Sequence, residues 1–329
     1  MTKSREVHLV ARPNGLPAVT DFEIVDSQVA DPTDGEVLVE NLYMSVDPAM
    51  RPRLTNGYEL HEPMSGTAIG RVVRSRTKDL AVGDLVMSRL GFREYFTARP
   101  DQLVKLDTPD GLPITVHMHA LGGTGFTAYG GLLKIAQLQP DDKVFVSTAA
   151  GAVGSVAVQI AKIHGCWVVG STGSAEKARW LAEEVGIDAV INYKEAPIRR
   201  GLRSVAPEGI DVYFDNVGGD HLDAALASMN TLGRVAVCGM ISGYNEPGAR
   251  TTVHNLANII YGRITLRGFT AADFPEMRPA FLREMSQWLR EGRVVYRETV
   301  LEGIESAPRA LIGLFEGINV GKMLVRLAD

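Results

Sequence analysis

Residues 143–164 read as a short apolar strand (143–147, KVFVS), a glycine-containing turn (149–154, AAGAVG) and a helix (155–164). In a strand–turn–helix unit of this kind, Gly151 lets the backbone approach a pyrophosphate and Gly154 lets the helix pack on the strand. Ala149 takes the place of the first glycine of this kind of turn, which alanine can do if its φ stays negative. Backbone N–H groups at the helix start then hold the phosphate. We assign the pyrophosphate site to Ala150, Gly151, Ala152, Val153 and Gly154.

The turn begins an alternating pattern of strands and helices. Six short β runs are predicted at 143–147, 166–170, 189–193, 212–215, 234–238 and 264–268, with helical segments between them. Such alternation predicts an α/β fold with a parallel sheet covered on both faces. Six strands at this spacing predict a doubly wound, Rossmann-type nucleotide domain. The pattern disfavours the alternative interpretation of 149–154 as an ordinary strand–helix turn.

The chain before this region is predicted to be β-rich. Segments 36–43, 67–74 and 84–87 are short β-like runs separated by turn signals, which is typical of a small barrel or sandwich. After an amphipathic helix at 277–291, β-like pieces at 296–300 and 322–326 are expected to return to the first domain. We therefore predict two domains, one formed by residues 1–120 with 294–329 and the other by residues 121–293.

Composition excludes several classes of function. The net charge of −5 argues against a nucleic-acid partner, which usually requires a basic stripe. Segments 111–133 and 144–161 lack charge but contain glycines and polar residues, so no membrane span is expected. The N-terminus lacks an apolar signal segment. Two isolated cysteines, Cys166 and Cys238, fit a cytoplasmic protein without a disulfide framework or an iron–sulfur cluster.

A metal site is not expected either. The first 150 residues contain no cysteine, whereas a zinc alcohol dehydrogenase needs Cys and His ligands near its active site. His117 and His119 form an H-x-H pair without an evident third ligand. We interpret them as polar positions near the domain junction.

The residues after the second predicted strand indicate which dinucleotide binds. An NAD site usually has an acidic residue about 20 positions after the glycine turn, where it binds the ribose hydroxyls. Here that position is 171–174 (STGS), and Lys177 follows it. A lysine ammonium attracts a 2′-phosphate, although the neighbouring Glu176 argues against this. We predict NADP(H) as the cofactor.

Together these motifs make the chain resemble the zinc-independent medium-chain dehydrogenases/reductases. The resemblance is to prostaglandin reductases, alkenal double-bond reductases and curcumin reductase-like enzymes, and it covers nearly the whole chain. It is carried by 46–51 (VDPAMR), 127–129 (TAY), 149–155 (AAGAVGS), 173–177 (GSAEK), 192–194 (NYK), 213–219 (YFDNVGG), 238–244 (CGMISGY), Tyr261 before 263–269 (RITLRGF), and 319–322 (NVGK). It implies a GroES-like barrel as the β-rich domain and a homodimer joined through the nucleotide domains, with 264–269 as the meeting edge.

The resemblance also implies roles for single residues. Those matching Lys177 and Tyr193 hold the 2′-phosphate end of the cofactor. The rest of the cofactor is lined by Asn216, Cys238, Gly239, Ile241, Ser242, Gly243, Tyr244, Phe269, Thr270, Ala271 and Asn319. The family's usual tyrosine after Asp-Pro is Ala49 here, which predicts a wider or differently shaped substrate pocket.

The expected reaction is NADPH-dependent reduction of the C=C bond of an α,β-unsaturated ketone or aldehyde. Hydride adds to the β carbon, and one neutral donor can stabilise the enolate oxygen that develops. Tyr261, which matches a family tyrosine near the nicotinamide, is the first candidate for this donor, and Tyr244 is the second. Either tyrosine could instead simply pack on the sheet. A quinone reductase and a non-catalytic NADPH-binding sensor remain the alternative functions.

Overall fold

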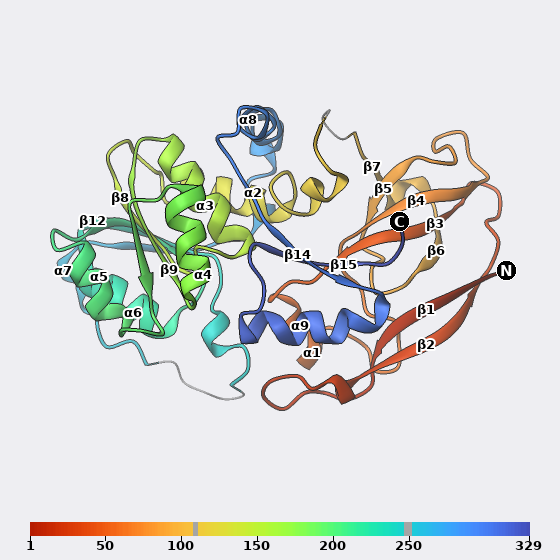
Figure 1. The fold of residues 1–329 in the computed structure, drawn as a ribbon, viewed down its shortest axis with the longest axis horizontal. Coiled ribbons are helices and arrows are strands. Elements are labelled where there is room, and N and C mark those ends of the chain that lie inside the picture. Colours follow the sequence, from red (N-terminus) through yellow and green to blue (C-terminus); the bar gives the residue numbers. More distant parts are fainter. Residues whose placement is uncertain (108–110, 247–251) are drawn as a thin grey trace. The chain divides into compact units, whose positions relative to one another are not determined.

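The computed structural model describes residues 1–107, 111–246 and 252–329 (Figure 1). They form two compact units. One unit is β-rich and comprises Met1–Met118, Glu298–Asn319 and Met323–Asp329. The other comprises His119–Arg297 and Val320–Lys322 and contains the glycine turn.

The second unit is built on a six-stranded sheet in the order β10-β9-β8-β11-β12-β13, in which all neighbouring strands run parallel. Its strands are β8 (Lys143–Val146), β9 (Trp167–Thr172), β10 (Ala189–Asn192), β11 (Ile210–Asp215), β12 (Met229–Val237) and β13 (Thr265–Gly268). The order reverses between β8 and β11, where a doubly wound sheet binds its ligand beyond the carboxyl ends of its strands. The predicted doubly wound parallel fold is confirmed.

Helices connect these strands. They are α2 (Gly123–Gly130), α3 (Ala152–Ile163), α4 (Ala175–Trp180), α5 (Ile198–Val205), α6 (Gly219–Ser228), α7 (Asn258–Tyr261) and α8 (Arg278–Arg290). Short 3-10 or π turns are η4 (Gly131–Ile135), η5 (Leu181–Val185), η6 (Ile241–Gly243), η7 (Ala271–Asp273) and η8 (Pro275–Met277). α5 and α6 bury Ile198, Leu202 and Leu222 with Phe145 and Tyr213 of the sheet. These two helices therefore cover one face, while α3 packs along β8 and β9.

The β-rich unit contains a seven-stranded sheet in the order β14-β15-β3-β4-β5-β7, with β6 pairing with β3, and a separate antiparallel hairpin, β1–β2, within its described part. The strands are β1 (Thr2–Leu9), β2 (Phe22–Val29), β3 (Val37–Ser45), β4 (Ala68–Ser75), β5 (Leu85–Ser88), β6 (Tyr95–Ala98), β7 (Val104–Lys105), β14 (Glu298–Glu302) and β15 (Lys322–Arg326). The helices and turns are α1 (Met50–Asn56), α9 (Ala307–Glu316), η1 (Val19–Asp21), η2 (Pro100–Gln102), η3 (Ile114–Met118) and η9 (Ile304–Ser306). The predicted β-rich domain is confirmed.

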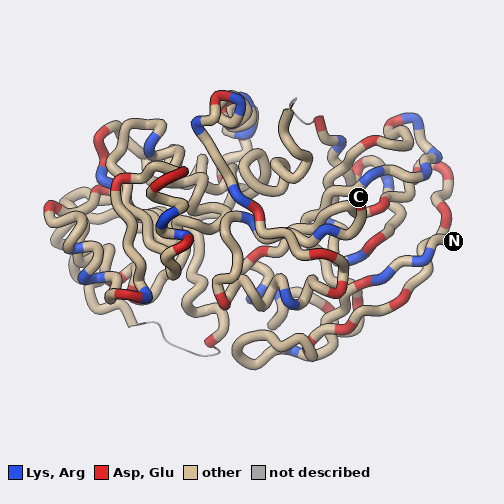
Figure 2. The backbone as a smooth tube through the Cα atoms, viewed as in Figure 1, with Lys and Arg blue, Asp and Glu red and all other residues tan. Residues whose placement is uncertain are grey.

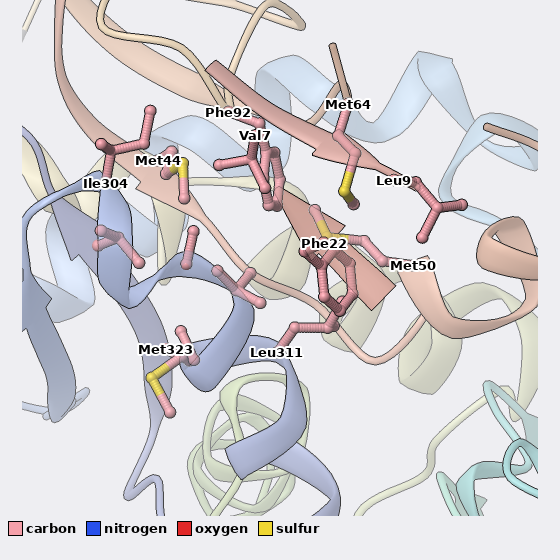
Figure 3. Packing of buried hydrophobic residues seen from close by; sticks show 14 of the residues in the cluster. Val7, Leu9, Phe22, Met44, Met50, Met64, Phe92, Ile304, Leu311 and Met323 are labelled. Carbon is pink, nitrogen blue, oxygen red and sulfur yellow. The ribbon is translucent and has the colours of Figure 1, made fainter. Parts of the chain in front are cut away.

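One core joins the two ends of the chain within this unit. Val7 and Phe22 of the hairpin pack with Met44 of β3, Leu311 of α9 and Met323 of β15 (Figure 3). The sequence patterns did not predict the hairpin or α9. Polar residues dominate the hairpin strands, and only scattered positions such as Val7, Leu9 and Phe22 are buried, so the local apolar signal is weak.

Acidic and basic residues are both dispersed over the two units (Figure 2). Many form surface ion pairs, for example Lys162 with Asp188 at 2.8 Å. In the described part of the chain, no helix is long and apolar enough to cross a membrane.

Candidate functional site

The glycine turn follows β8 and leads directly into α3. Thr148 adopts a left-handed conformation (φ 51°), Ala149 keeps a negative φ, and Gly151 is the N-cap residue of α3. The Gly151 N–H donates to the Thr148 carbonyl at 2.9 Å. A Cβ on Gly154 would lie 2.2 Å from that same carbonyl oxygen, so only glycine fits where the helix meets the turn. The turn therefore presents the amino end of α3 to an anion.

A segment distant in sequence is anchored to this turn. The Gly321 N–H donates to the Ala150 carbonyl at 2.8 Å. Gly321 has φ 67°, and a Cβ there would lie 1.8 Å from the Arg297 carbonyl oxygen, so glycine is required. This explains the glycine of the 319–322 motif. Asn319, the predicted cofactor residue beside it, is counted with the β-rich unit.

Of the residues predicted to bind the 2′-phosphate, Tyr193 directly follows β10, and Lys177 lies in the first turn of α4, the helix that follows β9. A Cβ on Gly173 would lie 2.7 Å from the Tyr193 hydroxyl, so that hydroxyl lies against the loop that leads into α4. Ser174 caps α4 by accepting the Lys177 N–H at 3.3 Å. Burial lowers the pKa of Lys177, while the nearby exposed Glu176 opposes that shift. The Lys194 ammonium lies 5.8 Å from the Tyr193 ring centroid and adds a second cation.

Two rings that the sequence interpretation did not single out support Tyr193. The His221 ring on α6 meets Tyr193 edge-on, with centroids 5.2 Å apart, and stacks on Phe145 of β8 at 6.4 Å. His221 is buried, and burial lowers its pKa to about 4. His221 is therefore a neutral packing ring beneath the predicted 2′-phosphate end. His221 is distant in sequence from both Tyr193 and Phe145, so no local pattern in the sequence indicated that these rings pack together.

Asn216 follows β11 and is fixed by Ser147 at the end of β8. Its backbone N–H donates to Ser147 Oγ at 2.9 Å, and its Nδ2 donates to the Ser147 carbonyl at 2.7 Å. The structure shows no hydrogen bond to Asn216 Oδ1 from the described residues. Because Nδ2 is engaged, the amide presents an acceptor to a ligand, which suits a ribose hydroxyl or an amide N–H.

Below Asn216, the buried Asp215 side chain organises the turn that follows. Its Oδ1 accepts hydrogen bonds from the Tyr213 hydroxyl at 2.7 Å and from the backbone N–H groups of Val217 and Gly218 at 2.9 and 2.8 Å. Its backbone carbonyl accepts the N–H groups of Cys238 and Gly239. Asp215 thereby ties the ends of β11 and β12 together.

The 238–244 loop folds back on this turn. Ser242 donates through its hydroxyl to the Val217 carbonyl at 2.6 Å, and the Tyr244 hydroxyl accepts the Met240 N–H at 3.3 Å. Burial, with a smaller contribution from the Asp215 charge, raises the pKa of the Cys238 thiol to about 12. The loop thus offers backbone groups and a tyrosine hydroxyl, while Cys238 stays a neutral thiol.

The last predicted segment, Phe269 to Ala271, leaves the carboxyl end of β13. The Phe269 ring packs edge-on against Phe214, with centroids 6.1 Å apart, and lies tilted against Phe274 at 6.0 Å, so it contributes to an aromatic cluster beside α2. The Thr270 N–H donates to Asp273 Oδ2 at 2.8 Å. This places the segment along the same edge of the sheet as the glycine turn.

Tyr261 is the predicted residue that the chain does not bring to this edge. It ends α7, just before the amino end of β13, and its side chain is 82% exposed. The predicted cofactor residues of this unit follow the carboxyl ends of strands, or begin the helices there. Of the two candidate donors, Tyr244 is therefore the one that lies beyond the carboxyl ends of the strands, which we call the cofactor edge.

The two histidines of the H-x-H pair, His117 and His119, belong to different units. His119 is buried, with its Nε2 3.0 Å from the Ala152 carbonyl and its ring edge-on to Tyr296. His117 lies in η3 of the other unit. Over residues 1–107, 111–246 and 252–329, no three His, Cys, Asp or Glu side chains gather in a way that could hold a metal.

The arrangement fits a phosphorylated dinucleotide. The glycine turn supplies backbone donors, Lys177 lies in α4 and Tyr193 directly after β10, and residues 171–174 bring no carboxylate. Asn216 and the 238–244 loop continue the same edge toward β13. These residues would hold the pyrophosphate, the 2′-phosphate and the nicotinamide end, respectively.

Comparison with family profiles matches both units. A profile described as "N-terminal domain of oxidoreductase" matches residues 5–106. A second, described as "Zinc-binding dehydrogenase", matches residues 152–287.

Curated relatives cover the whole chain. The chain is 40% identical to a putative NADP-dependent oxidoreductase, YfmJ, of Bacillus subtilis over 100% of this chain and 99% of the relative. It is 38% identical to the NADPH-dependent curcumin reductase of Escherichia coli, over 99% and 97% of the two chains. It is 39% identical to the NADP(+)-dependent 2-alkenal reductase of Nicotiana tabacum, over 99% and 98%.

Among solved structures, CurA of Vibrio vulnificus in complex with NADPH superimposes with a TM-score of 0.94 at 35% identity, over 99% of both chains. An Escherichia coli quinone oxidoreductase with NADPH shares the fold, with a TM-score of 0.77 at 22% identity, over 98% of this chain and 99% of the other.

Proposed function

Because this chain belongs to the zinc-independent medium-chain dehydrogenase/reductase family, we propose that it uses NADPH to reduce the C=C bond of α,β-unsaturated ketones and aldehydes. The observation that carries the proposal is the cofactor edge, where the glycine turn, Lys177 and Tyr193 come together without an acidic ribose ligand. The curcumin reductase and the 2-alkenal reductase, both named for reducing such substrates, support it.

The cofactor, when bound, supplies the hydride that adds to the β carbon of the enone, and a proton from water at the α carbon of the resulting enolate completes the saturated product. The protein's part is to align the substrate and to stabilise negative charge on the carbonyl oxygen as the C=C bond is reduced. A neutral hydroxyl is a sufficient donor for an enolate, so no metal is required. Tyr244 lies on the cofactor edge, and Tyr261 remains the alternative donor.

The pocket that receives the enone is proposed to be wider beside Ala49 than in relatives with a tyrosine there. Ala49 is the exposed N-cap residue of α1 in the β-rich unit. An Ala49→Tyr variant should therefore shift preference toward small enals, measured as kcat/KM for a short enal against a diaryl enone.

The product identifies the reaction. A panel of enals and enones is incubated with NADPH, and consumption of NADPH is followed together with loss of the conjugated absorbance. We expect a saturated ketone or aldehyde, identified by mass spectrometry and NMR. An allylic alcohol as product would contradict hydride addition to carbon. Turnover of quinones alone would indicate a quinone reductase, and tight NADPH binding without any turnover would indicate a sensor.

The proposal includes a cytoplasmic homodimer. The two cysteines are unpaired, as in a reducing compartment. Every residue of β13 is exposed, and an open edge strand of this kind favours pairing with a second copy.

A further inference from the structure

Three exposed arginines share one face of α5, the helix that follows β10: Arg199, Arg200 and Arg203. The buried residues of this helix are Ile198 and Leu202. At 3.6 residues per turn, the three arginines fall within about 100° of one another, on the side away from the buried pair. Among the described residues, none of the three arginine side chains forms a hydrogen bond or an ion pair. We call this surface the basic face of α5.

This arrangement lowers the stability of the helix. Arg199 and Arg203 are four residues apart, and like charges at that spacing repel each other along a helix. Arg199 and Arg200 also lie in the first turn of α5, which contains no acidic residue and where the helix dipole disfavours cations. Cations that oppose the preferences of their own helix, and that no described residue neutralises, indicate a function other than folding.

The amino end of α5 lies at the cofactor edge. Residues 193–197 link the carboxyl end of β10 to α5. The chain turns sharply there, because the Glu195 and Ala196 N–H groups both donate to the Asn192 carbonyl, at 3.1 and 3.3 Å. The first turn of α5 therefore begins at the same end of the sheet as Tyr193, which is predicted to hold the 2′-phosphate.

The charge of this segment is opposite to that of the whole chain. Residues 193–205 contain Lys194, the three arginines and one acid, Glu195, so they carry a net charge of +3, whereas the chain carries −5. Glu176 and Asp220 are exposed acids in the first turns of α4 and α6, which begin at the same edge. The cations of 193–205 outnumber these two acids, so the local field attracts an anion.

We infer that the basic face of α5, with Lys194, attracts the 2′-phosphate of incoming NADPH and guides the nucleotide to the site beside Tyr193; this rests on the proposed function, in which NADPH is the cofactor. The 2′-phosphate adds about two negative charges to the two of the pyrophosphate, so NADPH is attracted about twice as strongly as NADH. Such fields raise association rates by about 10- to 1,000-fold and fall steeply with ionic strength. The basic face thereby favours NADPH through the rate of association, whereas Lys177 acts on the bound nucleotide.

Stopped-flow measurement of nucleotide binding, followed by the fluorescence of the reduced nicotinamide, tests this role. At about 0.01 M salt, Arg199→Gln/Arg200→Gln/Arg203→Gln should associate with NADPH about tenfold more slowly than the wild type. Association with NADH, which carries about half the charge, should slow about threefold. Dissociation rate constants should stay within about twofold, because a charge that only steers does not hold the bound nucleotide. At about 1 M salt, where the Debye length is about 3 Å, the difference should disappear.

The matched control removes three positive charges elsewhere, in Arg76→Gln/Lys78→Gln/Arg290→Gln. These residues are exposed, and in the described part of the chain their side chains also form no ion pair. Each triple variant changes the net charge from −5 to −8. We expect the control to associate with NADPH at nearly the wild-type rate. Since the α5 variant loses the repulsion within its helix, it should resist urea at least as well as the wild type.

A lysine variant distinguishes a long-range field from direct contact. Arg199→Lys/Arg200→Lys/Arg203→Lys keeps the charge but loses the planar group that binds a phosphate through two hydrogen bonds. It should associate with NADPH at nearly the wild-type rate. Slow association of the lysine variant, or a glutamine variant whose loss lies in the dissociation rate, would show direct contact and overturn the inference.

The remaining outcomes are equally decisive. Equal slowing of the control and the α5 glutamine variant would assign the effect to net charge and overturn the role of α5. An α5 glutamine variant that associates as fast as the wild type at low salt would also overturn it. Nucleotide binding is measured without an enone, so a wild type that binds NADPH but reduces no enone would refute the proposed function alone.

Discussion

A Cβ built on Gly170 of β9 would lie 2.5 Å from the Cβ of Ala149 in the glycine turn. The first glycine of the dinucleotide fingerprint is thus replaced by alanine, and the neighbouring strand makes room for the extra methyl group. Ala149 is fully buried and its N–H donates to the Ser171 carbonyl at 2.9 Å, so neither residue can move away easily.

This contact predicts compensation between the two positions. Gly170→Ala should destabilise the protein by about 1–3 kcal/mol through overpacking. Combining it with Ala149→Gly should restore a substantial part of that loss, because the second change removes the methyl group that clashes. Denaturant unfolding of the two single variants and the double variant gives the coupling energy. Gly123→Ala, where a Cβ meets open space, is the control; strictly additive effects would show that the two positions are independent.

The sequence was sufficient to predict those elements whose residue pattern lies within one continuous segment. The apolar runs of β8, β9 and β11 and the turn before α3 are continuous segments, so both the strands and the doubly wound fold were predicted from them. The roles of Ser147, Gly170 and His221 were not predicted, since each acts on a residue of another strand or helix. Tyr261 shows the same limit, because proximity in sequence to a strand does not indicate at which end of the sheet the side chain lies.

Lys177 should determine the preference for NADPH over NADH. Replacing it with alanine removes a charge-assisted contact to the 2′-phosphate, worth roughly 1.5–3 kcal/mol. That corresponds to a loss of NADPH affinity of about 10- to 150-fold, with little change for NADH. Fluorescence titration with both nucleotides measures this, and Lys162→Ala, which removes a lysine paired with Asp188, is the control. Equal losses for the two nucleotides would exclude contact between Lys177 and the 2′-phosphate.

His221 should make the protein sensitive to mild acid. Burial lowers its pKa to about 4 in the folded state, whereas an unfolded histidine titrates near 6.5. Below about pH 6.5 the unfolded chain binds a proton that the folded chain does not, so stability falls as the pH drops toward 4. The full effect of this one group is on the order of 3 kcal/mol.

His221→Phe should therefore lose less stability than the wild type between pH 6.5 and 4.5. Urea unfolding at several pH values measures the difference, with the exposed His254 replaced by phenylalanine as the matched control. The two curves should converge above pH 7, apart from a constant offset due to packing against Phe145. If the unfolding free energy of His221→Phe falls with pH as steeply as that of the wild type, another group causes the acid sensitivity.

Leu266 should control assembly. It lies in the middle of the exposed β13, the proposed dimer edge, and the residue is 39% exposed. If two copies pair through β13, Leu266→Glu adds a negative charge from each copy to the paired strands, and like charges across paired strands are unfavourable. We expect light scattering at micromolar concentration to give the 35.6 kDa monomer for Leu266→Glu and a dimer for the wild type.

The control is Leu282→Glu, at a similarly exposed leucine of α8, which should remain dimeric. A monomeric wild type, or a Leu266→Glu variant that remains dimeric, would contradict this assignment.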